Sequence, residues 1–332
     1  MAVSLVGVSL APMSDPVSPT AERLWLPSWP CPVAAVLGPA RRGAGDPTYR
    51  ADPDGSIWRG LRTPDGVVTL RLASRPYDGR VHAAAWGPGS GWVLDQLPAM
   101  LGADDDPTGF EPCHDAIAAA HRSNPHWRVG RSGLVMESLV PAIIEQKVTG
   151  QEAFAGFRML VHRFGERAPG PGEQRRLWVQ PSPERIRMIP SWEWLRMHVD
   201  PARSRTLVLA AQVAASLERT VGLEAGEVDR RLRSLPGVGA WTSAEVRARA
   251  HGDADAVSFG DYHVAKDVGW VLTGEPADDA RLAELLEPYR PHRHRVQRLV
   301  ELAHLGRPRR GPRMAPRTHL PAGAVRGRGR SG

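Results

Sequence analysis

The sequence predicts a mainly helical protein that begins with a small α+β domain. Apolar residues recur at helical spacing through much of residues 134–305. Two short runs, residues 56–62 and 67–74, alternate apolar and polar residues in the manner of paired strands. A tight turn that contains Gly237 and Gly239 separates two of the helical patterns. These three observations predict the fold class, and the elements follow in chain order.

The N-terminal segment is predicted to hold an antiparallel sheet. Thr63-Pro64-Asp65-Gly66 separates the two alternating runs and is typical of a hairpin turn. Residues 81–86 supply a third strand, and residues 91–101 a short helix that covers the sheet. We place the small α+β domain at residues 21–105 and expect residues 1–20 to be a disordered N-terminus.

The rest of the chain is predicted to be helical as far as residue 305. Two long helices are expected at residues 134–164 and 204–219, because apolar residues recur there every three or four positions. Shorter helices are expected at residues 227–233, 241–250, 261–272, 279–286 and 292–305. We place a helical domain at residues 106–305 and a disordered, arginine-rich tail at residues 306–332.

Composition narrows the class of protein. The 332 residues carry a formal charge of +7, but residues 306–332 contain eight arginines and no acid, so the remainder is near −1 (7 − 8). The net charge therefore gives little information about what residues 1–305 bind. No run approaches the roughly 18 apolar residues of a membrane span. Cys31 and Cys113 form no CxxC pair, which argues against an iron–sulfur cluster or a disulfide framework.

The segment Leu235-Pro236-Gly237-Val238-Gly239-Ala240-Trp241-Thr242 lies between two helical patterns. Pro236 and the glycines favour a tight turn that residues with a Cβ atom would resist. The glycines let backbone N–H groups approach a phosphate, and the following helix presents its positive end to the same anion. We expect Val238 to fill the space between the two helices. The segment predicts a site that holds DNA backbone without reading sequence; an ordinary turn between helices is the alternative.

Asp261 follows this segment at a short distance. It lies twenty residues past Trp241, after a loop and before an apolar helical run. An aspartate at such a position is commonly a helix N-cap, and the residue alone favours that role. Its spacing from the hairpin favours a site residue instead.

Hairpin, helix, short loop and aspartate in this order resemble the helix–hairpin–helix (HhH-GPD) DNA glycosylases. The likeness is greatest to the branch of bacterial DNA-3-methyladenine glycosylase II. Ala142-Ile143-Ile144-Glu145-Gln146-Lys147-Val148-Thr149 resembles the start of a helix in that branch, Pro181-Ser182-Pro183-Glu184-Arg185-Ile186 its next helix entry, and Arg290-Pro291-His292-Arg293 its K-P-W-R segment. The resemblance spans residues 50–305. It implies two helical subdomains preceded by the small sheet domain.

The resemblance implies a mechanism. A base inside a duplex must be flipped into a pocket before it can be excised. Asp261 would then stabilise the oxocarbenium-like sugar and orient the attacking water. Bifunctional members of the superfamily carry a Schiff-base lysine where this chain has Trp241, so we expect a monofunctional hydrolase that leaves an abasic site. Trp241 is expected to form an aromatic wall of the base pocket, or to pack in the core behind the hairpin.

Three positions depart from the branch. Glu245 stands where an aromatic residue is usual, and either favours cationic bases or is a solvated helix position. His292 replaces a tryptophan of the pocket, which bears on substrate range. Lys147 replaces an apolar wedge and could contact phosphate. The pocket expected from the resemblance consists of Trp241, Glu245, Gln146, Tyr262 and His292.

The remaining expectations concern partners. The residues expected to contact DNA are Pro236, Gly237, Val238, Gly239, Thr242, Lys147 and His263. The resemblance also implies a structural Na⁺ or K⁺ at the hairpin, held by the backbone of Arg233, Leu235 and Val238, and no other cofactor. No zinc-type spacing of His and Cys is present. We expect a monomer that binds damaged double-stranded DNA and no membrane, in the cytoplasm of a bacterium and associated with its nucleoid.

The activity expected is excision of alkylated purines of the 3-methyladenine or 7-methylguanine type. Two alternatives stay open. The unusual Lys147, Glu245 and His292 are compatible with an inactive DNA-binding protein of the same fold, or with a glycosylase for oxidised or deaminated bases.

Overall fold

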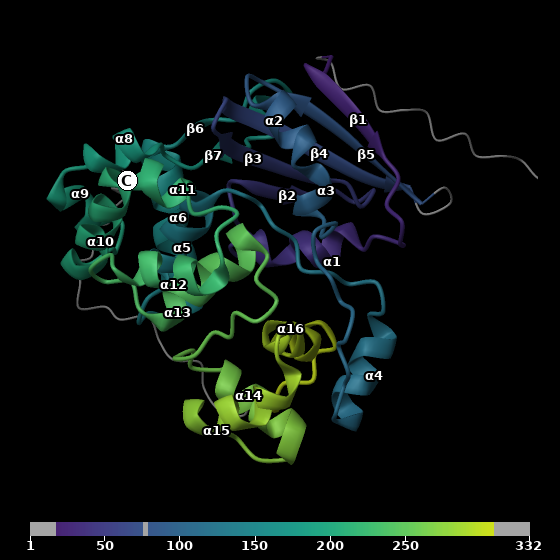
Figure 1. Ribbon diagram of the computed structural model, residues 1–332. Helices are drawn as coiled ribbons and strands as arrows, with labels where there is room; N and C mark the ends of the chain where they lie inside the picture. Colours follow the sequence, from purple (N-terminus) through teal and green to yellow (C-terminus); the bar gives the residue numbers. More distant parts are fainter. Residues whose placement is uncertain (1–17, 76–78, 309–332) are drawn as a thin grey trace, which may run out of the picture.

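The computed structural model describes residues 18–75 and 79–308. The expected disordered N-terminus, apart from residues 18–20, and the tail from residue 309 lie outside these ranges. A five-stranded antiparallel sheet forms the N-terminal part, in the order β1-β5-β4-β3-β2 (Figure 1). Its strands are β1 (Ala21–Trp25), β2 (Tyr49–Ala51), β3 (Ile57–Thr63), β4 (Gly66–Arg75) and β5 (Arg80–Trp86). The predicted hairpin is present as β3 and β4, which pair from Ile57 with Leu72 to Thr63 with Gly66.

Both faces of the sheet are covered. One face packs on α1 (Val33–Leu37), α2 (Ser90–Asp95) and α3 (Leu97–Met100). On the other face the stacked rings of Trp58 and Trp86 pack with residues of the 166–179 segment, which forms the short strands β6 (Glu166–Arg167) and β7 (Trp178–Val179). The sheet is thereby joined to the helical part.

The contact between sheet and helical part is close. A Cβ atom on Gly60 of β3 would lie 2.1 Å from the carbonyl oxygen of Trp178. Only glycine fits at this position without moving one of the two backbones.

Two separate apolar clusters organise the helices. The larger contains Leu139, Leu160 and Leu207 and gathers the helices that follow the sheet. These are α5 (Val135–Ile144), α6 (Gly150–Phe164), α8 (Pro183–Arg187), α9 (Ser191–Arg196), α10 (Pro201–Gln212), α11 (Ala214–Glu218), α12 (Ala225–Arg233) and α13 (Ala240–Val246). The short helix α7 (Pro171–Gln174) lies between β6 and β7.

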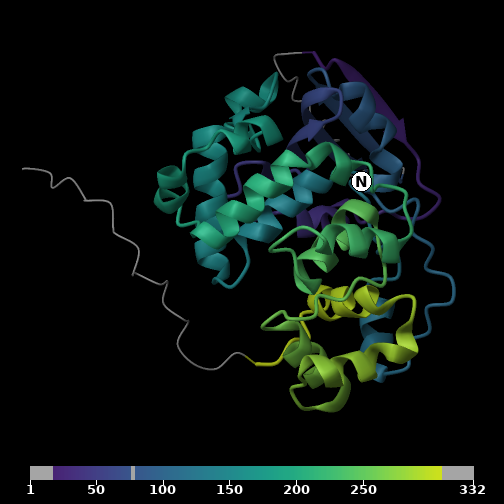
Figure 2. The same ribbon diagram turned by 60° about the vertical axis from the view of Figure 1, so that its left-hand side comes forward.

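The second cluster contains Ile117, Leu282 and Val296. It gathers α4 (Asp115–Ser123), α14 (Val264–Thr273), α15 (Asp279–Leu286) and α16 (Arg293–Leu302). Helix α4 comes before the first cluster in sequence but packs against α16, and Figures 1 and 2 both place the two side by side. The chain therefore runs from the second cluster to the first and back again.

Several predicted helices are interrupted. The helix expected at 134–164 is two helices, because the backbone breaks at residues 145–149, where Lys147 has φ +56° and Thr149 caps α6. The helix expected at 204–219 begins at Pro201, after the cap Asp200, and breaks at Val213. Residues 91–101 form the two short helices α2 and α3. A hydrophobic pattern with helical spacing continues across each break, so the pattern alone did not show it.

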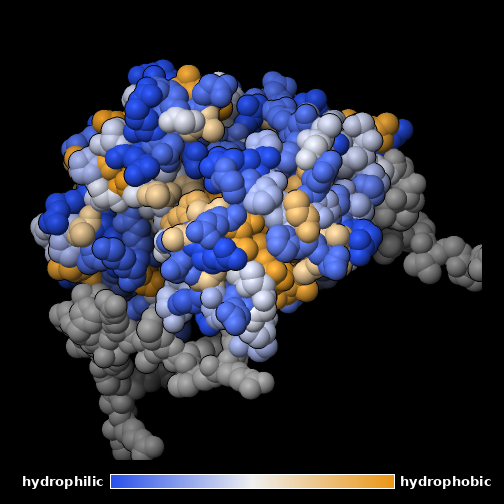
Figure 3. Space-filling view, turned by 60° about the horizontal axis from the view of Figure 1, so that its bottom comes forward, coloured by the Kyte–Doolittle hydropathy of each residue, from blue (hydrophilic) through white to orange (hydrophobic). Residues whose placement is uncertain are grey.

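Most of the molecular surface visible in Figure 3 is hydrophilic. Figure 3 shows one face, on which apolar surface gathers near the middle and hydrophilic surface surrounds it. None of the described helices has the length and apolarity needed to cross a bilayer.

Candidate active site

The hairpin between α12 and α13 has the conformation that its sequence requires. Gly237 has φ +90°, and a Cβ atom there would lie 2.0 Å from Thr206 Oγ1. Leu235 and Val238 are buried in the larger apolar cluster, as expected of Val238, while the hairpin residues Pro236 and Gly239 are exposed. The turn therefore presents backbone to solvent while its apolar side chains anchor it.

Gln146 holds the hairpin in place. Its Nε2 atom donates hydrogen bonds to the Gly237 carbonyl at 2.9 Å and to Thr242 Oγ1 at 2.8 Å. Gln146 is not among the residues that line the cavity described below. The expectation that it belongs to the base pocket is corrected: the break after α5 aims its amide at the hairpin.

Asp261 combines the two roles that its sequence position left open. Its Oδ1 atom accepts the backbone N–H groups of His263, the N-cap residue of α14, at 2.7 Å and of Val264, the first residue of that helix, at 3.1 Å, so Asp261 caps the start of α14 from two residues before the N-cap. Its Oδ2 atom accepts the indole N–H of Trp241 at 3.2 Å. The cap consequently fixes the carboxylate and leaves Oδ2 directed toward α13.

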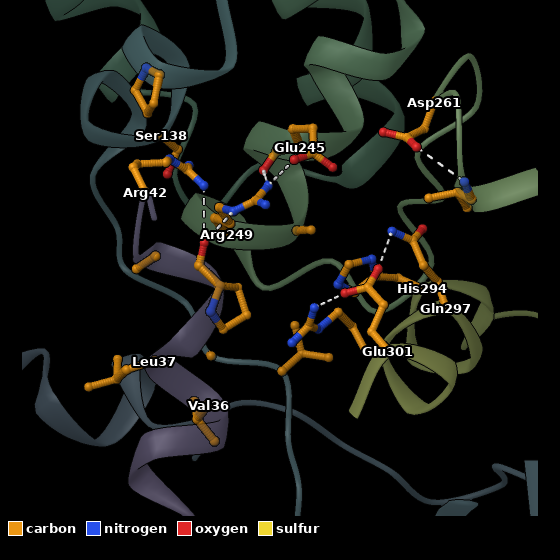
Figure 4. Close-up of a pocket in the computed structure, with 18 of the residues that line it drawn as sticks. Val36, Leu37, Arg42, Ser138, Glu245, Arg249, Asp261, His294, Gln297 and Glu301 are labelled. Atoms are coloured by element: carbon orange, nitrogen blue, oxygen red, sulfur yellow. Dashed lines mark hydrogen bonds and ion pairs between the residues drawn. The ribbon is translucent and has the colours of Figure 1, made fainter. Parts of the chain in front are cut away.

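Asp261 and Trp241 line a cavity of about 640 Å³. Its walls include the N-terminal region with Arg42 and Arg59, residues of α5, α13 and α14, and α16 with His294 and Gln297. In Figure 4, Arg42, Arg249, Glu245 and Asp261 follow one another across the pocket, with residues of α16 opposite. The cavity is large enough for a nucleobase together with ordered water.

Glu245 lies in the wall of this cavity but is not solvated. The residue is 8% exposed, its Oε2 atom is paired with Arg249, and its Oε1 atom accepts the Ser258 hydroxyl at 2.6 Å. Burial acts to raise the pKa of Glu245, but Arg249 and the Ser258 hydrogen bond outweigh it and hold the pKa below its ordinary value. The interpretation of Glu245 as a solvated helix position is wrong, because α13 turns this face inward.

His292 and Tyr262 lie outside the cavity wall. His292 is buried against the Phe110 ring, and its Nε2 atom lies 3.2 Å from the Thr108 carbonyl. Tyr262 is 69% exposed, with the Lys266 ammonium over its ring. The expectation that His292 and Tyr262 belong to the base pocket is corrected. Their positions in the sequence motifs did not determine the directions of their side chains.

The residues expected to touch DNA are mostly accessible. Lys147 and His263 are exposed, and His263 also lines the cavity next to Asp261. Thr242 is buried beneath the hairpin, where its hydroxyl accepts from Gln146, so a direct contact of this side chain with DNA is corrected to support of the turn.

Sequence reasoning missed the charged groups that enter the cavity from the N-terminal side. Arg42 pairs with Glu145 at 3.3 Å, and Arg59 with Glu137 at 3.3 Å. Burial raises the pKa of Glu137 to about 7. Glu137 carried a signal, since it is a lone carboxylate in the apolar run of α5; Arg42 lies in a segment without periodicity and carried none.

The described residues show no His, Cys and carboxylate grouping that could hold a metal ion. At the hairpin, the Leu235 carbonyl accepts the Val238 N–H at 3.0 Å and has a second lone pair for another partner. Backbone carbonyl oxygens can replace the hydration shell of a monovalent cation such as K⁺.

The chain was compared with known proteins by sequence and by structure. By sequence, no protein-family model and no curated protein matches the chain. Its structure is similar to that of a 3-methyladenine DNA-glycosylase from Archaeoglobus fulgidus, with TM-score 0.68 and 17% identity over 85% of this chain and 98% of that one. It is also similar to Clostridium acetobutylicum 8-oxoguanine glycosylase/lyase, with TM-score 0.62 and 11% identity over 82% and 93% of the two chains.

The chain has the fold of the helix–hairpin–helix DNA glycosylases. The Leu235–Gly239 turn joins α12 to α13, and Trp241 and Glu245 of α13 line the cavity. The similar structures span several specificities, and one is in complex with double-stranded DNA that contains cytosine opposite 8-oxoG.

Proposed function

We propose that the protein is a monofunctional DNA glycosylase that hydrolyses the N-glycosidic bond of alkylated purines in duplex DNA. One observation carries the proposal. Asp261 lies in the wall of a cavity that is large enough for a nucleobase, and its carboxylate accepts a hydrogen bond from Trp241, two residues past the hairpin. A carboxylate, an aromatic ring and a backbone-presenting turn supply the three requirements of the reaction: cation stabilisation, base stacking and DNA backbone binding.

The reaction would proceed with the flipped base in the cavity. The bond between C1′ and the base nitrogen breaks, and the base leaves with the bonding electron pair. Asp261 stabilises the cationic sugar, because its three hydrogen bonds fix a carboxylate that lines the cavity and leave Oδ2 able to accept a further interaction. Water then adds to C1′ and gives up a proton to the Asp261 carboxylate, which later releases it to solvent, and an abasic site is left.

The choice of alkylated purines rests on the Trp241 ring and on the likeness to a 3-methyladenine DNA-glycosylase. An electron-poor alkylated base stacks favourably on an electron-rich indole. Glu245 does not add attraction for a cationic base, since Arg249 already neutralises its carboxylate. The ring, and not a free carboxylate, would therefore select the lesion.

We propose that the protein has no lyase activity. The chain contains two lysines, and neither Lys147 nor Lys266 is among the residues that line the cavity. Schiff-base chemistry at C1′ requires a deprotonated amine close to the sugar. An enzyme without such an amine releases the base and leaves the strand intact.

DNA would be held by exposed features around the cavity. We propose that the N–H groups of Gly237 and Gly239 and the side chains of His263 and Lys147, all of which are exposed residues, contact phosphates of the duplex. We further propose that a Na⁺ or K⁺ on the hairpin carbonyls of Arg233, Leu235 and Val238 stiffens the turn. We propose that the protein acts as a monomer in the cytoplasm.

Base release from methylated duplex DNA tests the activity. Wild type is expected to release 3-methyladenine or 7-methylguanine and to leave the strand uncut until it is treated with alkali. Asp261→Asn should lose at least two orders of magnitude in single-turnover rate. Asp65→Asn, an exposed aspartate in the β3–β4 turn, is the matched control. Equal release by Asp261→Asn and wild type, or nicking by wild type, would contradict the proposal.

A glycosylase for oxidised guanine is the second candidate. The similarity to 8-oxoguanine glycosylase/lyase structures and the charged side chains of the cavity favour it. A panel of duplexes, each with one alkylated, oxidised or deaminated base, separates the two. Tight, salt-dependent binding to lesion duplexes without release of any base would instead indicate an inactive DNA-binding protein.

A further inference from the structure

We infer that Glu245, acting through Ser258, is a positioning residue that fixes the loop carrying Asp261. The inference deepens the proposed function, because its effect on rate presumes that Asp261 is the catalytic carboxylate. It assigns Glu245 a role other than contact with the base.

Ser258 is the junction between three elements. It is 1% exposed, and each of its polar groups has a partner. The hydroxyl donates to Glu245 Oε1 of α13 at 2.6 Å, the N–H donates to Gln297 Oε1 of α16 at 3.2 Å, and the carbonyl accepts the N–H of Asp261 at 3.2 Å. The backbone of Asp261 is therefore hydrogen-bonded to a residue that is itself hydrogen-bonded to α13 and to α16.

Glu245 is a strong and immobile acceptor. Its carboxylate is ionised, and Arg249 binds Oε2 from one turn further along the same helix. Arg249 is itself fixed, since its Nε atom donates to the Pro39 carbonyl at 3.3 Å. A hydrogen bond to a buried charged acceptor is shorter and roughly twice as strong as one between neutral groups.

Helix α13 controls Asp261 in two ways. Trp241 and Glu245 are four residues apart and so lie on one face of the helix. Trp241 donates to the Asp261 carboxylate, and Glu245 reaches the Asp261 backbone through Ser258. The helix begins directly after the hairpin. Helix α13 therefore fixes the position of the Asp261 carboxylate relative to the hairpin, which is proposed to hold the DNA.

Contact with the base is the competing role for Glu245. Both carboxylate oxygens already have partners, and only 8% of the residue is exposed. A base would have to displace Arg249 or Ser258 to use this carboxylate. Positioning requires no such rearrangement.

Kinetics of Ser258→Ala and Glu245→Gln test the inference. Both variants should lower the single-turnover rate about 10- to 100-fold with little change in DNA affinity, since a displaced catalytic group costs rate and not binding. The double variant should be no slower than the slower single variant, because both act through one hydrogen bond. Ser243→Ala is the matched control: its buried hydroxyl lies on α13 and donates to Asp229 at 2.7 Å, away from the loop.

An activity-independent measurement accompanies the kinetics. The indole N–H resonance of Trp241, assigned with Trp241→Phe, reports the hydrogen bond to Asp261. We expect it to shift in Ser258→Ala and to stay in place in Ser243→Ala. Should Glu245→Gln fail to fold, because Arg249 loses its partner charge, Ser258→Ala still carries both readouts.

The outcomes separate the inference from the proposed function. Wild-type rate and an unmoved resonance in Ser258→Ala would overturn the inference. So would a Glu245→Gln enzyme that changes its lesion preference while Ser258→Ala behaves as wild type, because that pattern indicates base contact. Wild type that releases no base from any duplex overturns the proposed function, and the resonance then still reports whether Ser258 positions Asp261.

Discussion

The indole nitrogen of Trp241 donates a hydrogen bond of 3.2 Å to Oδ2 of Asp261. The resemblance described above implies a lysine at this position in bifunctional glycosylases, where this chain has the tryptophan. The side chain that takes the place of the amine thus orients the carboxylate. Hydrolysis and the absence of lyase chemistry would then share one structural cause.

Trp241→Phe should separate the two uses of this side chain. The phenyl ring still stacks, but the hydrogen bond to a charged acceptor, worth about 1.5–3 kcal/mol, is lost. We expect the rate of base release to fall at least tenfold while lesion preference is kept, as measured with the duplex panel. Trp241→Ala should lose preference as well; equal behaviour of the two variants would show that the hydrogen bond does not contribute.

Gly237→Ala should destabilise the hairpin. The φ of +90° and a Cβ atom 2.0 Å from Thr206 Oγ1 predict a loss of about 1–3 kcal/mol or more, measured by urea denaturation. Gly239→Ala is the matched control for stability, since nothing lies within 4 Å of its Cβ position. It should fold normally and still bind duplex DNA more weakly, because the added methyl group keeps a phosphate from the backbone.

Asp105→Asn should lower the free energy of unfolding more than the substitution of a residue at the surface does. Asp105 and Arg295 form a buried pair, with Nη2 2.7 Å and 2.9 Å from the two carboxylate oxygens. Removing one charge leaves the other unpaired, at a cost of about 3–5 kcal/mol. Asp104→Asn, whose partner Arg131 is on the surface, should cost less than about 1 kcal/mol. Similar midpoints of urea unfolding for the two variants would refute this.

Glu137 should make stability depend on pH. Its pKa rises from 4.5 to about 7 on folding, so the folded protein binds more protons than the unfolded chain between these values. Stability from this group is full below about pH 4.5 and is lost as the pH rises through 7, by up to about 3 kcal/mol. Glu137→Gln should flatten the stability profile over this window, with Glu284→Gln, an exposed glutamate, as control. A Glu137→Gln profile parallel to wild type would be the contrary result.

Deletion of residues 309–332 should weaken DNA binding by charge alone. The deleted segment contains seven arginines and no acid. We expect a shallower dependence of log affinity on log salt concentration and an unchanged rate at saturating enzyme. A salt slope equal to that of the full chain would show that the tail does not touch DNA. Arg307, which pairs with Asp267 at 3.2 Å, is retained in the shortened chain.

The features that could be predicted from the sequence are those that depend on residues close together in the chain. The hairpin, its buried Val238 and the cap at Asp261 follow from local rules for glycine, apolar residues and aspartate. The breaks at Lys147 and Val213 could not be predicted, because the apolar pattern continues through them. His292 was misplaced for a related reason: the backbone path beyond a motif decides where its side chains point.

The cavity wall was the least predictable feature. Arg42 and Glu145 are about a hundred residues apart, and no periodicity links them. Such a pair forms only when the sheet packs on the helices, so a local pattern cannot indicate it. Even the spacing of Glu245 from Trp241 showed a shared helix face and not the Ser258 hydroxyl across the loop.

The close contact of Gly60 with the Trp178 carbonyl bears on how the protein can be divided. A shortened chain that contains only the helical part would lack the sheet that packs through this contact. It would also lack Arg42 and Arg59, which line the cavity. One side of the pocket would then open to bulk water, which would screen the charges that act on a sugar cation. If the proposed activity is correct, the sheet belongs to the catalytic unit, and the helices alone would not suffice for it.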